Sequence, residues 1–399
     1  MKKNKDVYLD GAANTPLDRK VYKAMKPYLK HSFVGNSAAI HNHGIKAYKK
    51  LEECRKVIAD CLKVNKSGVY FTSGATESNN WVINSLAFNE MKKPNGKKHI
   101  IVSAIEHKSV LSVCKHLESF GFKISYVYPH QTGGYITVES VEKLLTKDTL
   151  LVCVMGTNNE TGSVSHIESI AQKAHEYGAL MLSDCTQHLS CGGNFIKLGE
   201  MNPSVDYFTF SSHKIYGPTG VGCLIVQNNS PIFPLLLGGS QEKGVRGGTS
   251  NLAGIVGMAK AVELLCRNSH ADHYYKLYCH LFNKLYKLGI FDLFKTNGEP
   301  SRYNIISLNC TKYINCKDQL ASRLAAYGIS VSAGSACDAD NNETDEGVFN
   351  PSHVLVALGL PENEIRNTIR ISFTKYSTCS DIDRLIKALI KIRKDINGG

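Results

Sequence analysis

The sequence predicts an α/β protein with a large, mostly parallel sheet and a second, smaller α+β domain. Between about residues 69 and 226, short runs of β-branched and aliphatic residues alternate with stretches whose apolar residues recur at helical spacing. This alternation is typical of parallel strands joined by helices that cover both faces of a sheet. After about residue 265 the alternation ends, and longer helical patterns flank fewer strands.

The elements of the first part follow from their local patterns. Residues 47–62 place their apolar side chains on one helical face. Residues 165–168, Ser-His-Ile-Glu, have the capping-box pattern and predict the start of a helix that Gly178 ends. Strands are predicted at 69–72, 99–103, 123–127, 149–155, 179–182, 205–210 and 222–226, with further helices around 82–87 and at 108–120.

The second part is predicted to mix helices and strands in a less regular order. A last helix is indicated by Ile382, Leu385, Ile386 and Leu389, which share one face. The other predicted elements are a helix at 271–288, a strand at 304–309, a helix near 317–327 and a strand at 329–332.

Composition limits the class of protein. The chain is 43% hydrophobic and 21% charged, and it has no apolar run near the roughly 20 residues of a membrane span. Its charged start lacks an apolar segment, so we expect a cytoplasmic protein.

Thirteen cysteines without a Cys-x-x-Cys pair favour free thiols over disulfides or a metal site. The net charge of +12 indicates either a well-solvated surface or a docking face for an acidic partner protein or for RNA. No interleaving of aromatic and basic residues favours nucleic acid specifically.

Lys214 is the residue around which the predicted site is organised. It stands just past the apolar strand at 205–210, follows Ser211 and His213, and precedes the Gly-Pro turn at 217–218. A lysine in such a place is unsuited to packing, but its amine can condense with an aldehyde once its pKa is lowered. The stretch therefore indicates a phosphorylated cofactor that carries an aldehyde.

Other strand ends are predicted to meet Lys214 at the same edge of the sheet. Asp184, Asn159 and His107 each follow a predicted strand, and ligands of open α/β sheets gather at the carboxyl ends of the strands. A carboxylate there can hold a protonated ring nitrogen, an amide can donate to a phenolate, and a histidine can stack on a flat ring. The turn at 74–76 precedes a helix and offers backbone N–H groups to an anion.

Cys337 is the second unusual residue. Small residues precede it, and a loop rich in Asp, Asn and Glu follows it. Because no apolar periodicity surrounds this cysteine, it is predicted to be an exposed, mobile thiol of the kind that sulfur transfer requires.

Eight stretches together resemble the cysteine desulfurases of the NifS/IscS type, which belong to the class V aminotransferase group of fold-type I pyridoxal phosphate (PLP) enzymes. They are 8–10 with Ala13, 71–79, 106–107, 158–162, 184–187, 211–218, 246–249 and 334–337. The resemblance covers nearly the whole chain. It implies the aspartate aminotransferase-like fold, with a large PLP-binding domain at 15–265 and a small domain formed by 1–14 and 266–399 that carries the cysteine loop.

The resemblance also implies a role for individual residues. Lys214 would bond covalently to PLP and later move the substrate α-proton, Asp184 would pair with the pyridine nitrogen, and His107 would stack on the ring and help in proton transfer. Gln187 and Asn159 would contact the phenolic oxygen. The phosphate would be held by Ala75, Thr76, Ser211 and His213, and by Thr249 of the neighbouring subunit; Arg370, with Asn36 and Asn159, would bind the substrate carboxylate.

The implied reaction takes sulfur from L-cysteine, releases L-alanine and leaves a persulfide on Cys337. The implied partners are a second copy of the chain with shared active sites and a sulfur-acceptor protein, either an iron–sulfur scaffold or a tRNA-thiolation enzyme. The alternatives within the same fold are selenocysteine lyase and cysteine sulfinate desulfinase.

Two departures from the family pattern affect these expectations. Asn36 lacks the proline that usually follows it, which weakens its assignment to the carboxylate. The segment 338–350 is longer than expected and carries five acidic residues without a basic one. It is either a solvated loop or an acidic arm that selects a basic sulfur acceptor and raises the pKa of the Cys337 thiol.

Overall fold

A computed structural model describes residues 6–192, 196–301, 303–316, 319–334 and 350–397. Within them, the largest sheet has seven strands in the order β2-β8-β7-β6-β5-β3-β4. Six strands run in the same direction and β8 runs against them, so the predicted mostly parallel α/β sheet is confirmed. The strands are β2 (Val69–Thr72), β3 (His99–Ser103), β4 (Lys123–Val127), β5 (Thr149–Cys153), β6 (Leu180–Asp184), β7 (Tyr207–Ser211) and β8 (Gly222–Val226).

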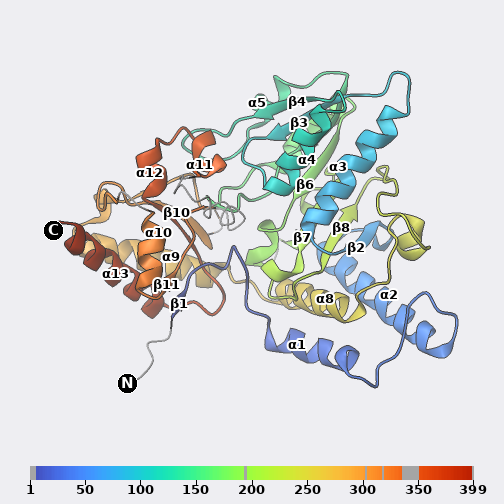
Figure 1. Ribbon diagram of the computed structural model, residues 1–399, viewed down its shortest axis with the longest axis horizontal. Coiled ribbons are helices and arrows are strands. Elements are labelled where there is room, and N and C mark those ends of the chain that lie inside the picture. The colour runs from blue at the N-terminus through green and yellow to red at the C-terminus, as the bar shows by residue number, and fades with distance from the viewer. Residues whose placement is uncertain (1–5, 193–195, 302, 317–318, 335–349, 398–399) are drawn as a thin grey trace, which may run out of the picture.

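Helices cover both faces of this sheet (Figure 1). On one face, α2 (Asn42–Leu62), α6 (Ile167–Glu176) and α8 (Leu252–Arg267) contribute to a single apolar core. On the other, α3 (Ala75–Met91) and α4 (Lys108–Glu118) form a second core. Because successive side chains of a strand point to opposite faces, Phe208 of β7 lies in the first core and Tyr207 in the second.

A smaller unit is built on β10 (Ile305–Asn309), which pairs antiparallel with β12 (Thr368–Ser372) and β9 (Lys295–Thr296). The N-terminal strand β1 (Val7–Tyr8) joins it by pairing with β11 (Ile329–Ser330). This pairing supports our proposal that 1–14 and 266–399 form one domain and 15–265 the other. The helices of this part are α9 (Ala271–Lys287), α10 (Leu320–Ala326), α11 (His353–Ala357), α12 (Glu362–Arg366) and α13 (Cys379–Asn397). Three short helices belong to residues 15–265 instead: α1 (Arg19–Met25), α5 (Val138–Glu142) and α7 (Leu198–Met201).

The predicted capping box at the start of α6 is wrong. His166 is the N-cap residue and makes no side-chain cap hydrogen bond. The Ser165 hydroxyl instead accepts from the N–H of Ile136 at 3.1 Å, and the Glu168 carboxylate accepts from the hydroxyl of Ser204 at 2.6 Å. Both side chains that the local pattern assigns to the cap are therefore bonded to residues from other parts of the fold.

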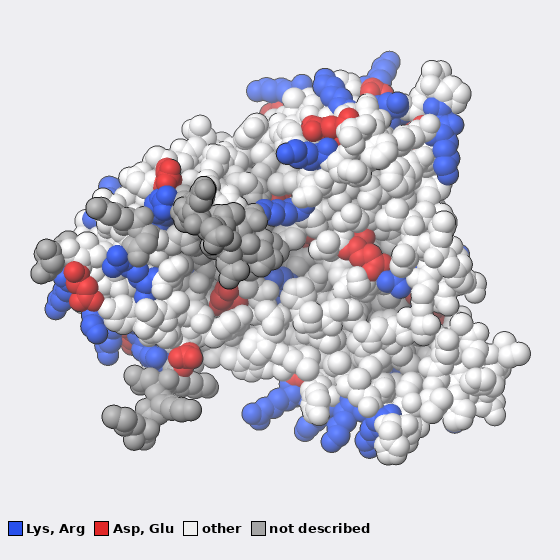
Figure 2. Space-filling view, in the orientation of Figure 1, with Lys and Arg blue, Asp and Glu red and all other residues white. Residues whose placement is uncertain are grey.

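Lys and Arg side chains gather along the upper and lower rims of the face shown in Figure 2, and α1 at the lower rim exposes Arg19, Lys20 and Lys23. In the described part of the chain, no helix combines the length and the apolar character that crossing a membrane requires.

Candidate active site

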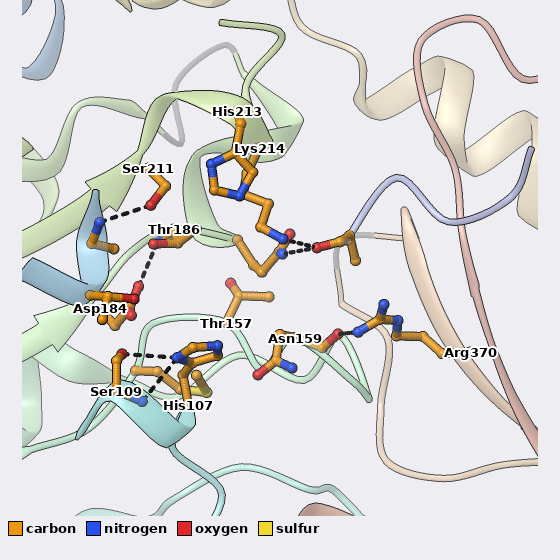
Figure 3. Close-up of a pocket in the computed structure, with 15 residues that line it drawn as sticks. His107, Ser109, Thr157, Asn159, Asp184, Thr186, Ser211, His213, Lys214 and Arg370 are labelled. Carbon is orange, nitrogen blue, oxygen red and sulfur yellow. Dashed lines mark hydrogen bonds between the residues drawn. The ribbon is translucent and has the colours of Figure 1, made fainter. Parts of the chain in front are cut away.

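A pocket lies at the carboxyl ends of the parallel strands, where the large sheet faces β12 (Figure 3). Asp184 ends β6, while His107 and Asn159 follow β3 and β5. Asp184 and Arg370 approach the pocket from opposite sides. The lining residues are Ala12, Ala75, Thr76, His107, Ser109, Met155, Thr157, Asn159, Asp184, Thr186, Gln187, Ser211, His213, Lys214 and Arg370.

Lys214 enters the pocket from a short turn after β7. Its Nζ donates to the carbonyl oxygen of Ala12 at 2.7 Å and to that of Ala13. The backbone of this turn is tightly constrained, since Tyr216 adopts a left-handed φ of 66°. A Cβ at Gly217 would come within 2.0 Å of the Ser212 hydroxyl. The chain therefore fixes the position from which the amine reaches the pocket.

Asp184 is held at both carboxylate oxygens. Its Oδ2 accepts from Nδ2 of Asn79 at 2.9 Å, and its Oδ1 accepts from the N–H of Thr186 at 2.9 Å. The side chain is buried, so these donors also compensate for the loss of water. The carboxylate is thus oriented before any ligand arrives.

His107 and its neighbour Glu106 follow β3. His107 is the N-cap residue of α4, and its Nδ1 accepts from the N–H of Ser109 at 3.1 Å. The fully buried Glu106 accepts from the N–H of Met155. Burial raises the pKa of Glu106 to about 8, and the charge of Asp184 adds to the increase, against the lowering effect of the Met155 N–H.

The N-terminus of α3, a helix of 17 residues, offers backbone N–H groups that suit an anion. The N–H of Ala75 donates to the Ser211 hydroxyl oxygen at 2.8 Å, which leaves the hydroxyl hydrogen to donate elsewhere. His213 is neutral at pH 7, because burial and then the charge of Lys214 lower its pKa to about 4. A side chain at Gly222 would bring its Cβ within 2.4 Å of the Gly74 Cα, so β8 packs directly against this turn.

Arg370 forms the opposite wall from β12. Its Nη2 donates to Asp10 at 2.9 Å, and its Nη1 donates to the Asn159 carbonyl oxygen at 3.1 Å. Two buried atoms here, Nε of Arg370 and Oδ1 of Asn159, have no hydrogen-bond partner among the described residues. Buried polar atoms are normally paired, so this wall is suited to a polar ligand.

Two predicted site residues, Thr249 and Asn36, do not line the pocket, and a third lies outside the described residues. Thr249 is exposed outside it. Asn36 is exposed too, and its Oδ1 accepts from the N–H of Ala38 at 3.0 Å. Cys337 lies outside the described residues, as does all of the acidic segment 338–350 except Asn350.

The sequence reasoning overlooked five lining residues: Ala12, Ser109, Met155, Thr157 and Thr186. Ser109 and Thr186 each stand two positions after a predicted site residue, at the start of the segment that follows a strand. A hydroxyl residue at such a position indicates a further site residue, because its short side chain can bond to neighbouring site residues.

Comparison with known proteins decides the family. The profile of the family described as Aminotransferase class-V matches residues 7–385. The chain belongs to this family. This class-V member is 37% identical over 390 residues to the cysteine desulfurase IscS of Dictyoglomus turgidum, covering 97% of this chain and 94% of that protein.

Solved structures agree with this assignment. A NifS-like protein superposes with a TM-score of 0.83 at 32% identity, covering 99% of this chain and all of that one. A structure of SspA in complex with cysteine superposes with a TM-score of 0.75 at 34% identity, covering 93% of this chain and 99% of that one. The expected fold-type I architecture is thereby confirmed.

Enzymes of the class-V family are PLP-dependent, and the pocket fits that cofactor. It offers an amine for the aldehyde, a buried carboxylate for the ring nitrogen and a helix N-terminus for the phosphate. The buried Oγ1 of Thr186 has no hydrogen-bond partner among the described residues and can therefore bond to a ligand.

Proposed function

We propose that this protein is a PLP-dependent cysteine desulfurase that converts L-cysteine to L-alanine and keeps the sulfur as a persulfide on Cys337. The observation that carries the proposal is the convergence of Lys214, Asp184 and Arg370 on one pocket. An amine and a carboxylate suit the cofactor, and a guanidinium opposite them suits the carboxylate of an amino acid. Cysteine desulfurase is also the activity named for the relative from D. turgidum.

PLP would be held by residues whose surroundings match its parts. Lys214 would bond to the aldehyde, Asp184 would pair with the ring nitrogen, and His107 would lie against the ring. The phosphate would bind at Ala75, Thr76, Ser211 and His213, and the phenolic oxygen at Gln187 and Asn159. When bound, PLP supplies a conjugated electron sink that stabilises negative charge on the substrate.

The chain's own groups would bind the substrate and move its proton. Arg370 would bind the carboxylate through Nε and the guanidinium nitrogens, and so fix the Cα–H direction. The Lys214 amine would remove the proton from Cα. Asn36 would bind the carboxylate only from a second copy of the chain, because it is exposed and does not line the pocket of its own chain.

Sulfur transfer would then proceed by nucleophilic attack. The thiolate of Cys337 attacks the substrate sulfur, so an S–S bond forms while the Cβ–S bond breaks. The electron pair of the broken bond would remain on Cβ, which takes up a proton, and the proton that Lys214 removed would be returned to Cα, so that L-alanine is released. The alternatives, selenocysteine lyase and cysteine sulfinate desulfinase, are not favoured, since the relatives from D. turgidum and Methanosarcina thermophila are named cysteine desulfurases.

The test is steady-state turnover of L-cysteine, L-selenocysteine and L-cysteine sulfinate by the PLP-loaded protein. We expect L-alanine from L-cysteine, and loss of that activity in Cys337→Ser with retained activity on selenocysteine. Cys61→Ser is the matched control, because Cys61 lies at the far end of α2 and does not line the pocket. Equal turnover of L-cysteine by Cys337→Ser and wild type would contradict the proposal.

The proposed homodimer shares its active sites through Thr249. In support, Thr249 is exposed and does not line its own pocket. Two loops also expose large apolar side chains, with Ile40 at 94% and Leu237 at 81% of full exposure. Arg246 is bonded to Glu77 through two contacts of 2.7 and 3.0 Å, which fixes the start of the Thr249 segment beside α3.

A mixed dimer tests this sharing. A Lys214→Ala subunit paired with a Thr249→Ala subunit retains one complete site if Thr249 serves the partner, and the dimer should keep about half of wild-type activity. If Thr249 serves its own subunit, both sites are damaged and the activity falls well below half. Light scattering should first give the mass of two chains.

The acceptor of the persulfide is proposed to be a protein, either an iron–sulfur scaffold or a tRNA-thiolation enzyme. The acidic segment 338–350 beside Cys337 suits a basic acceptor surface. Deleting 340–348 should slow sulfur transfer to the native acceptor while L-cysteine turnover with a small thiol continues. Unchanged transfer rates and an unchanged titration of the Cys337 thiol would contradict this role.

A further inference from the structure

We propose that Asn79 and Ser109 link Asp184 to His107 through a directed chain of hydrogen bonds that holds His107 as its Nε2–H tautomer. Asn79 lies in the first turns of α3 and Ser109 at the start of α4. The two residues thereby connect the proposed partner of the cofactor nitrogen with the histidine that would lie against the ring. Both act by positioning other groups.

The direction of the chain is set at Asp184. A carboxylate only accepts, so the Asn79 atom at 2.9 Å from Oδ2 is the amide nitrogen, which donates. The position of the amide oxygen is consistent with this assignment, because Oδ1 of Asn79 accepts from the Thr209 hydroxyl at 2.6 Å. Asn79 and Thr209 are fully buried, so water does not offer an alternative arrangement.

The donor to His107 is fixed by the same reasoning. Nδ2 of Asn79 also donates to the Ser109 hydroxyl oxygen at 3.0 Å, so the single hydroxyl hydrogen is left for Nδ1 of His107 at 2.8 Å. The backbone N–H of Ser109 points at the same Nδ1, at 3.1 Å. Two hydrogens converge on Nδ1, so in the neutral ring this atom carries none and Nε2 is protonated.

This tautomer has a consequence for the reaction, and that consequence rests on the proposed function. The far edge of the His107 ring faces the middle of the pocket, toward Thr157 (Figure 3). With its hydrogen on Nε2, neutral His107 presents a donor there and has no free lone pair with which to remove a proton. Proton abstraction from the substrate is therefore assigned to Lys214, and His107 contributes a hydrogen bond.

Nitrogen NMR of the full-length protein, labelled with ¹⁵N-histidine, tests the tautomer without relying on turnover. The His107 signals are assigned by their loss in His107→Gln, and correlations between ring nitrogens and carbon-bound protons distinguish the two neutral forms. We expect the Nε2–H form in the wild type, with and without PLP. In Ser109→Ala, the ratio of Nε2–H to Nδ1–H forms should fall about fivefold to tenfold, the effect of losing one hydrogen bond.

Ser112→Ala is the matched control, because Ser112 lies on the same helix and is exposed. It should leave both the tautomer ratio and kcat unchanged. Ser109→Ala should lower kcat about fivefold to tenfold with little change in KM. Asn79→Leu should shift the tautomer ratio in the same direction as Ser109→Ala, provided that circular dichroism shows it to be folded.

Two results would overturn the relay: an Nδ1–H tautomer in the wild type, or a tautomer ratio in Ser109→Ala that equals that of Ser112→Ala. Because the spectra need no substrate, a failed desulfurase assay would refute the proposed function and leave the relay standing. The converse holds equally, since L-cysteine turnover with an Nδ1–H histidine would retain the function and refute the relay.

Discussion

The two walls of the pocket differ in how completely their polar groups are bonded. On the sheet side, Asp184 has a donor at each carboxylate oxygen and is tied through Asn79 into the buried core between α3 and β7. On the β12 side, Arg370 leaves its buried Nε without a partner among the described residues, and Asn159, which follows β5 and bonds to Arg370 through its carbonyl oxygen, leaves Oδ1 in the same state. The Asp184 carboxylate of the sheet wall is therefore oriented by the chain alone, with Oγ1 of Thr186 beside it left for a ligand, whereas the guanidinium of the β12 wall is completed by a ligand.

This difference matches two kinds of ligand. A cofactor that stays through many turnovers gains from groups that are already oriented, because little reorganisation is needed when charge develops. A substrate that must leave gains from groups that bond only while it is present. The comparison therefore predicts that damage to the sheet wall affects cofactor binding and kcat, and that damage to the β12 wall affects KM.

Replacing Asp184 should have the largest effect. Asp184→Ala removes the buried charge at the proposed cofactor nitrogen, so kcat for L-cysteine should fall about a hundredfold to a thousandfold. PLP affinity, measured by the recovery of visible absorbance in apoprotein titrations, should also decrease. Asp60→Ala, which removes a surface partner of Lys56, is the control. Near wild-type turnover in Asp184→Ala would break the distinction between the walls.

Replacing Arg370 should have a smaller effect that appears mainly in KM. Arg370→Lys keeps the charge and loses the planar fork and Nε, so the KM for L-cysteine should rise about tenfold to a hundredfold. Arg366→Lys, at a surface ion pair with Glu362, serves as the control. A drop in kcat with KM unchanged would mean that the β12 wall acts on the transition state and not on substrate binding.

A prediction on stability concerns Glu106, which lies behind the sheet wall. The pKa of Glu106 is about 8 in the folded chain and near 4.5 when exposed, so the folded state binds the extra proton between these values. Its stabilising contribution is full below about pH 4.5 and is lost as pH rises through 8. Glu106→Gln should therefore gain stability over wild type as pH rises, by on the order of a few kcal/mol above pH 8.

Urea unfolding at pH 6 and pH 9 measures this gain. Glu118→Gln, an exposed residue of α4, should follow the wild type at both pH values. An equal difference between Glu106→Gln and wild type at the two pH values would show that Glu106 does not titrate in this range.

The sheet wall was predictable from sequence because each of its residues follows a strand of recognisable pattern. Asp184, His107 and Lys214 could be placed at one edge from strand order alone. The Asp184–Asn79–Ser109 contacts could not, since they join three elements far apart in sequence and depend on side-chain directions. Arg370 was assigned by resemblance only, and the Thr-Ile-Arg-Ile-Ser strand that carries it was not predicted.

Helix α8 shows a different limit of sequence reasoning. Its residues Leu252–Leu265 are buried on most sides, so the one-sided apolar pattern that marks a surface helix is missing. The capping box at 165–168 failed for the opposite reason, because a correct local pattern was overridden by distant partners at Ile136 and Ser204.

The central claim is that Lys214 is the covalent anchor of PLP at the preorganised wall. Borohydride reduction of the PLP-loaded protein, followed by peptide mapping with mass spectrometry, tests it most directly. We predict one pyridoxyl group per chain, attached to the peptide that contains Lys214 and absent from Lys214→Ala. A reduced cofactor attached to another lysine, or a chain left unmodified after loading, would contradict the account.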